Sequence, residues 1–280
     1  MTAQEELIST EELISTIEAG IKSGQYPAFV YKYRKADDCN TLSILTNNTL
    51  WFDNLDNFND PYDCNVPIDD EKSKDVVRQY FKAIGATDAE ITNWLANPDE
   101  LQKTIKKHIE KALSHLGVCC FSKLYDDMLE WAHYGDSHKG VCFKFDLLEL
   151  CKGLDFFIPI PVHYQMELPR YNHCAETKEI VNKIIKPKSC CWNYEQEIRI
   201  VKQGIINKTD DKSTIIQKRK VVFGSNALKE IIFGVKTPLD LIDKYKQTCS
   251  NYTDKKHIDF YKMELGTGTY YGLIKKQIIQ

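Results

Sequence analysis

The hydrophobic period of the chain changes near residue 117, and this change restricts the fold to those that combine helices with a sheet. From residue 72 to 117, apolar residues recur at the three- and four-residue spacing of a buried helix face, with one stripe made of Leu101, Ile105, Ile109, Leu113 and Leu116. After it, the period falls to two over residues 118–122, 140–146 and 157–164, which predicts strands. The sequence therefore predicts an α+β domain with a helical insertion before its main sheet.

Other segments extend this pattern on both sides. Residues 29–34, 50–52, 218–223, 230–233, 257–264 and 269–275 read as strands, and residues 191–201 are the clearest strand. The basic residues Lys218-Arg219-Lys220, at the start of one of them, are expected to form a solvated rim. Helices are predicted over 41–47 and 175–185 and from Pro238 onward. In the insertion, Thr87 and Glu90 form a capping box, Asn97-Pro98 begins a helix, and Gly117 is expected to cap its end.

The first segment contains a short repeat, because residues 5–10 and 11–16 both read EELIST. Leu7, Ile14, Ile17 and Ile21 fall on one helical stripe, and the opposite face is acidic. This helix either packs on its own domain or docks a protein partner. The predicted organisation is an N-terminal amphipathic helix in residues 1–28 and a single domain in residues 29–280, with its helical insertion at about 70–117.

Composition excludes several classes of protein. The 280 residues carry a formal net charge of -3, which argues against bulk electrostatic binding of nucleic acid or anionic membranes. No apolar run is long enough to span a bilayer, and the start lacks a secretory signal, so a cytoplasmic protein is expected. The ten cysteines then read as reduced thiols, with Cys119-Cys120 and Cys190-Cys191 each inside a strand. They include no CxxC pair, and no metal is predicted.

The predicted strand over 191–201 has two different faces. Trp192, Tyr194, Ile198 and Ile200 would share a largely apolar face, and the other face would carry Asn193, Glu195, Glu197 and Arg199. Paired carboxylates on one face stay ionised when they are solvated or partnered. This face is therefore either an exposed surface with a Glu197–Arg199 pair, or the wall of a cleft in which the carboxylates face a substrate.

Two loops carry further polar and aromatic residues. In residues 131–140, Trp131 and Tyr134 line one side of a short helix with Met128, whereas the histidines there match no ligand spacing. In residues 58–63, the sequence FNDPYD is typical of a tight turn, and the loop lacks the glycine and terminal glutamate of a calcium site. Core packing and turn geometry explain both loops without a ligand.

Taken in order, these motifs resemble a known bacterial family. Tyr31-Lys-Tyr33, FNDPYD at 58–63, CFS at 120–122, the segment 131–146 and WNYEQEIRI at 192–200 are similar to the domain of unknown function 2971. The same order looks like the ADP-ribosyltransferase fold, which implies a split mixed/antiparallel sheet that binds NAD in its cleft. In that resemblance, Glu197 is the carboxylate that binds the nicotinamide ribose, and Glu195 helps the acceptor attack.

The resemblance also assigns binding residues for NAD. Ser122 takes the serine place on the middle strand, and Trp131 and Tyr134 line or stack on the nicotinamide pocket. Where toxin-like members have Tyr-His on the first strand, this chain has Tyr31-Lys32, and Lys cannot copy the neutral geometry of imidazole. Tyr33 is the alternative residue for that role.

The functional expectation is an intracellular ADP-ribosyltransferase-like enzyme that uses NAD, such as a toxin or phage-defence effector. Its acceptor, protein or nucleic acid, stays open. One alternative is a non-catalytic binding or regulatory protein on the same fold, with a partner at the N-terminal helix. The other is a nucleic-acid-processing enzyme that depends on Asp60 or Asp63.

Overall fold

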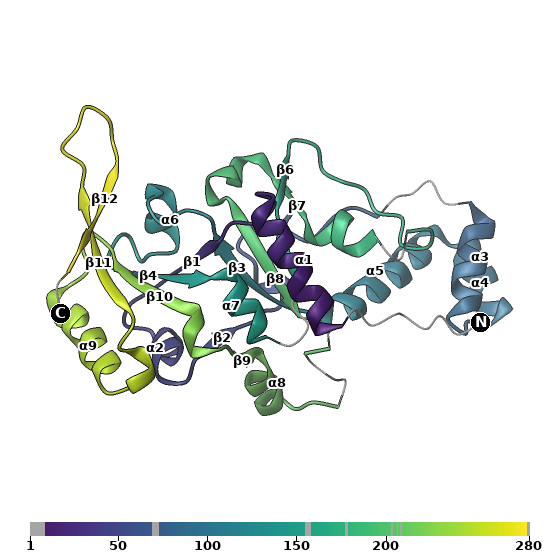
Figure 1. Cartoon of the computed structure of the whole chain (residues 1–280). Helices are drawn as coiled ribbons and strands as arrows, with labels where there is room; N and C mark the ends of the chain where they lie inside the picture. The colour runs from purple at the N-terminus through teal and green to yellow at the C-terminus, as the bar shows by residue number, and fades with distance from the viewer. Residues whose placement is uncertain are drawn as a thin grey trace.

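A computed structural model of the chain describes residues 9–68, 73–154, 158–176, 179–202, 204–205, 207 and 209–278. Its main feature is an eight-stranded sheet in the order β12-β11-β10-β4-β1-β3-β8-β5 (Figure 1). β10 and β11 are parallel, and the other neighbours are antiparallel. The predicted α+β class with a mixed sheet is thus confirmed. The strands are β1 (Phe29–Arg34), β3 (Gly117–Ser122), β4 (Val141–Asp146), β5 (Ile158–Pro161), β8 (Glu197–Lys202), β10 (Leu228–Phe233), β11 (Asp259–Leu265) and β12 (Leu273–Gln277).

Smaller elements surround this sheet. Two further pairs are formed by β2 (Thr49–Trp51) with β9 (Lys220–Val222) and by β6 (His163–Gln165) with β7 (Pro187–Ser189). The α-helices are α1 (Thr10–Lys22), α2 (Cys39–Thr46), α3 (Lys74–Ala83), α4 (Asp88–Ala96), α5 (Pro98–Ser114), α6 (Met128–His133), α7 (Leu147–Lys152), α8 (Lys212–Arg219) and α9 (Leu239–Ser250). Short helical turns are η1 (Leu55–Asn57), η3 (Val181–Ile185), η4 (Cys190–Glu195), η5 (Ser225–Ala227) and η6 (Thr253–Lys255).

The sheet opens between β1 and β3. β1 pairs with β4 over all six of its residues, and β3 pairs with β8 over all six of its own. Between β1 and β3, by contrast, the register joins a single pair of these described strands, Tyr31 with Ser122. Beyond that pair the two strands diverge, and the gap between them is where a ligand-sized space can form.

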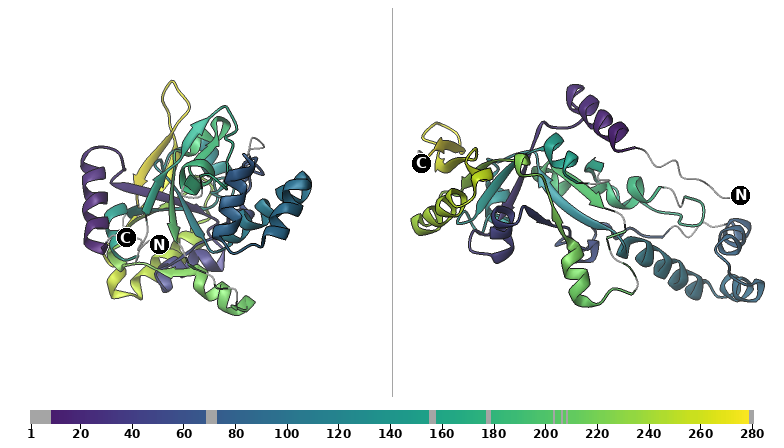
Figure 2. Two further views of the ribbon diagram at one scale, coloured as in Figure 1. Left: turned by 90° about the vertical axis from the view of Figure 1, so that its right-hand side faces the viewer. Right: turned by 60° about the horizontal axis from the view of Figure 1, so that its bottom comes forward.

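α1 packs on the body of the protein. Ser9 caps it in a reciprocal capping box with Glu12, and Ile17 is buried in the main core, with Leu13 and Ile21 packed beside it. The helix contacts α7 and lies along one side of the molecule (Figure 2). Leu7, the first residue of the predicted stripe, lies outside the described residues.

α3, α4 and α5 form the predicted helical insertion, at the opposite end of the molecule from the β11–β12 hairpin (Figure 1). The capping box of Thr87 and the start at Pro98 are confirmed. The expected C-cap at Gly117 is wrong, because the helix ends at Ser114 and Gly117 begins β3. A Cβ at Gly117 would lie 2.6 Å from Ile205, so close packing explains this glycine.

The predicted strand over 191–201 is partly wrong. Cys190–Glu195 is a 3₁₀-helix, Gln196 has a left-handed φ of 45°, and β8 begins only at Glu197. The neighbouring strands have ended at this point, because Ser122 and Pro161 pair with Glu197 and Ile198. Residues 190–195 therefore have no sheet partner and close their own hydrogen bonds, and the Cys190-Cys191 pair is helical rather than extended.

Three other segments differ from the expectation. The run 157–164 divides into β5 and β6, which belong to different sheets. The predicted strand over 218–223 is shorter, because Lys218 and Arg219 are the last residues of α8 and β9 begins at Lys220. Arg219 is buried and donates to the carbonyl of Phe52 at 2.8 Å, so it does not lie on a solvated rim. Of the predicted helix over 175–185, η3 is a single π-helical turn, and residues 157, 177 and 178 lie outside the described residues.

Candidate functional site

A pocket of about 280 Å³ occupies the opening between β1 and β3. The loop after β2, which contributes Asn59 and Asp63, lines it together with Glu130 of α6 (Met128–His133) and Tyr134 at the end of that helix. Its lining includes seven of the eight residues that the sequence proposed for the site: Tyr31, Lys32, Tyr33, Ser122, Tyr134, Glu195 and Glu197. These residues come from four separate segments, so the fold itself brings them together.

Three of these residues stand in one row across the sheet. Tyr31 on β1 is registered with Ser122 on β3, and Ser122 is registered with Glu197 on β8. Directly paired residues project their side chains from the same face of a sheet. The row therefore places a phenol, a hydroxyl and a carboxylate side by side at the point where the sheet opens.

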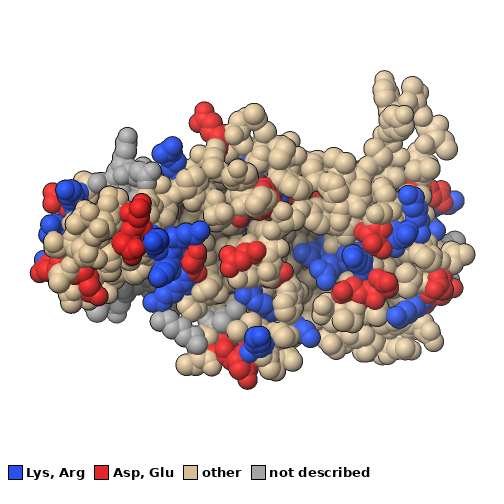
Figure 3. Space-filling model, turned by 180° about the vertical axis from the view of Figure 1, so that it is seen from behind, with Lys and Arg blue, Asp and Glu red and all other residues tan. Residues whose placement is uncertain are grey.

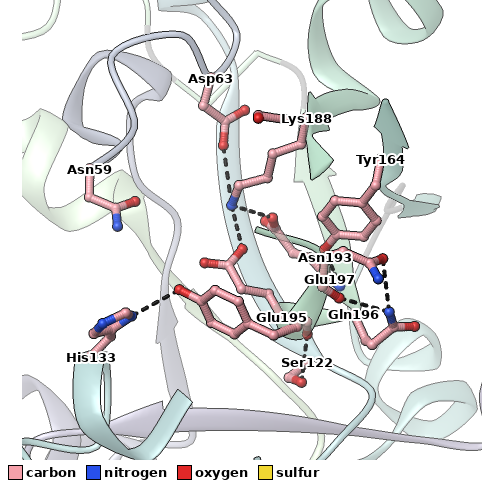
Figure 4. Close-up of polar contacts among 12 residues, drawn as sticks. Asn59, Asp63, Ser122, His133, Tyr164, Lys188, Asn193, Glu195, Gln196 and Glu197 are labelled. Carbon is pink, nitrogen blue, oxygen red and sulfur yellow. Dashed lines mark hydrogen bonds and ion pairs between the residues drawn. The ribbon is translucent and has the colours of Figure 1, made fainter. Parts of the chain in front are cut away.

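The floor of the pocket is a buried network of charges around Lys188 (Figure 4). The Lys188 ammonium donates to the carboxylate of Glu195, lies 2.9 Å from Glu197 Oε2, and lies 3.5 Å from Asp63 Oδ2. Lys188 comes from β7 and Asp63 from the FNDPYD loop. The three carboxylates are thus joined through one ammonium group.

Arg199 completes the network from below the pocket. Its guanidinium donates to Glu197 Oε1 at 2.9 Å, to Asp63 Oδ2 at 2.6 Å and to the carbonyl of Ile185 at 2.7 Å. The side chain is fully buried. With three carboxylates and two cations, the five charged groups carry a formal charge of -1.

Burial and partners set the protonation states of the network. Burial alone would raise the pKa of Glu197, but Arg199 and Lys188 outweigh it and hold this pKa well below its usual range. Burial lowers the pKa of Lys188, yet the carboxylates of Glu197, Glu195 and Asp63 raise it overall. For Glu195, burial prevails over Lys188 and the pKa is raised. Glu197 and Lys188 are therefore both ionised at neutral pH.

Hydrogen bonds fix Glu195 at the edge of the pocket. The Tyr134 hydroxyl donates to Glu195 Oε1 at 2.6 Å and accepts from the Asn59 amide at 3.0 Å. The Ser122 hydroxyl donates to the backbone carbonyl of Glu195 at 2.7 Å. Ser122 thus holds the end of η4 in place, a role that its position on the middle strand alone did not indicate.

Three of the expected binding residues have other partners. Trp131 is fully buried and packs edge-on against Tyr33, at 5.0 Å between ring centroids, so it lies behind the pocket instead of lining it. The Lys32 ammonium donates to the carbonyl of Cys120 at 2.7 Å and so crosses the opening between β1 and β3. The Tyr33 hydroxyl donates to the carbonyl of Leu124 at 2.9 Å.

Sequence reasoning missed several residues of the site. The turn predicted for FNDPYD does not indicate the ion pairs of Asp63, because its partners Lys188 and Arg199 are distant in the sequence. Lys188 is close in sequence to Glu195 and Glu197, but it lies between the predicted helix over 175–185 and the predicted strand over 191–201, where no pattern indicates it. Glu130, buried on α6, also lines the pocket. The density of Asp and Asn in the FNDPYD loop was the one available signal, and it points to Asn59 and Asp63.

Beside the buried network, two aromatic side chains, Trp192 and Tyr194, lie on η4 outside the lining of the pocket. His133 Nδ1 lies 2.8 Å from the Tyr194 hydroxyl, and the rings of Trp192 and Tyr194 are 6.0 Å apart. The Lys188 ammonium lies 5.3 Å from the centre of the Trp192 ring. Lys188 thus has a cation–π contact with η4 in addition to its ion pairs with the carboxylates.

Comparison with known proteins finds a similarity to one family over part of the chain. The model of the family described as Protein of unknown function (DUF2971) matches residues 130–200, which include Glu130, Lys188, Glu195 and Glu197. No curated protein and no solved structure matches the chain. Within the described residues, the helices are too short or too polar to cross a membrane. Over residues 130–200, the chain therefore carries the DUF2971 sequence pattern, as its motifs predicted.

Proposed function

We propose that the protein is an ADP-ribosyltransferase-like enzyme that binds NAD in the pocket between β1 and β3. The observation that carries this proposal is the row of Tyr31, Ser122 and Glu197 at the opening of the sheet. The resemblance placed these residues on the first, middle and late strands of a split sheet. A pocket at that opening is the arrangement that such an enzyme requires.

Glu197 has the charge that the reaction needs. When nicotinamide leaves NAD, positive charge develops on the ribose, and a fixed carboxylate beside it lowers the barrier. Glu197 is buried and ionised, and its partners hold it in one orientation. Since the network retains a formal charge of -1, Lys188 and Arg199 do not cancel its negative potential.

The size of the pocket limits which part of NAD it would hold. Pockets for drug-sized ligands measure about 300–1,000 Å³, and this one is about 280 Å³. We infer that the nicotinamide riboside portion enters, with Tyr134 beside it, while the rest of NAD lies along the rim. Lys32, in place of the usual histidine, donates to Cys120 across the opening and would shape the pocket rather than bind ribose. A cytoplasmic toxin or phage-defence role remains a prediction of the resemblance.

The proposal is tested with a Glu197→Gln variant. Purified protein is incubated with NAD, and nicotinamide release is followed by chromatography, with water as the acceptor. We expect release by the wild type and a loss of about 10²–10³-fold in the variant, the usual effect of removing one group that stabilises transition-state charge. The fold should survive, because the remaining two carboxylates balance Lys188 and Arg199.

Two controls make the result specific. Glu264→Gln removes an exposed carboxylate of the β11–β12 hairpin, outside the pocket, and should leave release unchanged. Thermal unfolding of all three proteins checks that Glu197→Gln is folded. If the folded wild type neither binds NAD nor releases nicotinamide, the proposal is wrong.

A second candidate function is NAD-type binding without chemistry. It is favoured by the direct bonds from Lys188 to both glutamates, which occupy oxygens that the transfer reaction would use. This alternative predicts that the wild type binds NAD, measured by calorimetry, but releases no nicotinamide. Release above the level of the Glu197→Gln variant would exclude it.

A further inference from the structure

Glu130 is a buried carboxyl in the pocket that no cation neutralises among the described ion pairs. It is 4% exposed and lines the pocket together with Ser122, Glu195 and Glu197. Each carboxylate of the network has Lys188 or Arg199 as a partner, whereas Glu130 has neither. Burying a carboxyl group without a cation costs folding free energy, so we expect Glu130 to have a function in the pocket.

Glu195, the residue first expected to help the acceptor attack, is poorly available as a proton acceptor. Its Oε1 accepts from Tyr134 and its Oε2 accepts from Lys188, so both oxygens are occupied. Glu130 lies one helical turn before Tyr134 on α6, on the same wall of the pocket. It faces the same space, but its side-chain hydrogen-bond partner there is the Ser122 hydroxyl, and neither Lys188 nor Tyr134 donates to it.

The surroundings of Glu130 favour its neutral form. Burial, and then the negative charge of Glu195, raise its pKa to about 8. The groups that face Glu130 are all acidic or neutral. They are Asp127 at the N-cap of α6, Tyr194 and Glu195 on η4, Glu197 on β8, Tyr33 on β1, Ser122 on β3 and Cys142 on β4. Burial raises the pKa of Tyr194 to about 12 and those of Tyr33 and Cys142 well above their usual values, so they stay neutral at pH 6–9.

We propose that Glu130 is the general base that takes the proton from the attacking acceptor. This inference rests on the proposed function. As the acceptor oxygen or nitrogen bonds to the anomeric carbon of the ribose, the bond from that carbon to nicotinamide breaks. The electron pair of that bond goes to the nicotinamide nitrogen, and the acceptor proton passes to the Glu130 carboxylate. A base is most effective when its pKa lies near the working pH.

The test is a pH–rate profile with NAD as substrate and water as acceptor. For the wild type we expect nicotinamide release to rise about tenfold per pH unit from pH 6 and to level off above about pH 8. For Glu130→Gln we expect a flat profile and a rate lower by about 10²–10⁴-fold, the usual contribution of a general base. Glu149→Gln, on α7 and outside the pocket, is the matched control and should keep the wild-type profile.

A second measurement separates the base from a structural role. Carbon-13 NMR of glutamate carboxyls should show one group titrating near pH 8 in the wild type and missing in Glu130→Gln. Release by a Glu130→Gln variant with the wild-type profile would overturn the role of Glu130 alone. Absence of release from the wild type would overturn the proposed function, and this inference with it.

Discussion

At the scale of single residues, Lys188 joins the site into one unit. It contacts Glu195, Glu197 and Asp63, which come from η4, β8 and the loop after β2. Removing one partner from a buried charge cluster leaves the others uncompensated, and this commonly costs about 3–5 kcal/mol. The formal charge of the network would change from -1 to -2 without Lys188.

We therefore predict that Lys188→Met lowers the free energy of unfolding by about 3–5 kcal/mol at pH 7.5, measured with urea. The pKa of Glu195, already raised, should rise further in the variant. A folded-state pKa above the unfolded value means that the folded protein binds more protons, so stability falls as pH rises through this range. The deficit of the variant should consequently be smaller at pH 5 than at pH 7.5.

Lys152→Met supplies the comparison for this prediction. Lys152 pairs with Glu149 at 3.0 Å, but its side chain is 40% exposed, against 5% for Lys188. Exposed pairs contribute about 0–1 kcal/mol, so this variant should unfold almost like the wild type. An equal loss in the two variants would show that burial of the network contributes nothing.

At the scale of elements, the turn at Gln196 decides how η4 meets β8. Gln196 has a left-handed φ of 45°, and its side-chain amide donates to the backbone carbonyl of Asn193 at 2.7 Å. A β-branched residue tolerates this conformation poorly, and the left-handed region costs roughly 1–2 kcal/mol for an L-residue. The choice of residue at position 196 should therefore change the free energy of unfolding by a measurable amount.

We predict that Gln196→Val unfolds at lower urea, with a loss of about 1–2 kcal/mol relative to Gln196→Gly. Glycine adopts the positive φ without steric cost, although it too loses the bond to Asn193. Comparing the two variants therefore isolates the backbone term. If valine proves as stable as glycine, residue 196 does not need the left-handed conformation.

Local signals in the sequence predicted most elements, but not this one. The caps at Thr87 and Pro98 and the alternation in β1, β3 and β4 are determined by neighbouring residues, and they are confirmed. Residues 191–201 alternate just as regularly, yet β3 and β5 end beside Glu197 and Ile198 and leave 190–195 unpaired. Where a neighbouring strand ends depends on the tertiary structure, and so do the contacts that Lys188 and Asp63 make. Sequence reasoning found Glu195, Glu197 and the pairing of Glu197 with Arg199, although Arg199 is buried and not exposed, but it did not find Lys188 or Asp63 as partners.

At the scale of the whole molecule, charge is spread over the surface while the insertion keeps a core of its own. Seen from behind, basic and acidic side chains are interspersed (Figure 3), as the small net charge suggests. The insertion buries Val77, Phe81, Ile91 and Ile105 in a cluster that also includes Cys174 from outside it. We infer that the insertion behaves as a cooperative unit that can open separately from the sheet.

His173 makes a polar contact between this unit and the rest of the protein. It is buried, its Nε2 lies 2.7 Å from the Tyr80 hydroxyl of α3, and its Nδ1 lies 3.3 Å from the Tyr171 hydroxyl. Burial, with a further effect of His108, lowers its pKa to about 4. Between pH 6.5 and 4 the open form binds a proton that the closed form does not, so the closed form loses stability as pH falls.

We predict that the amides of α3–α5 lose protection from hydrogen exchange between pH 6.5 and 4.5, after correction for intrinsic rates. The shift of His173 corresponds to about 2–3 kcal/mol over this range, while amides of β4 in the sheet should keep their protection. His173→Gln has no titrating ring and should remove the pH dependence of the insertion. If protection falls equally in this variant, another group controls the contact, because the histidine would then contribute no proton uptake.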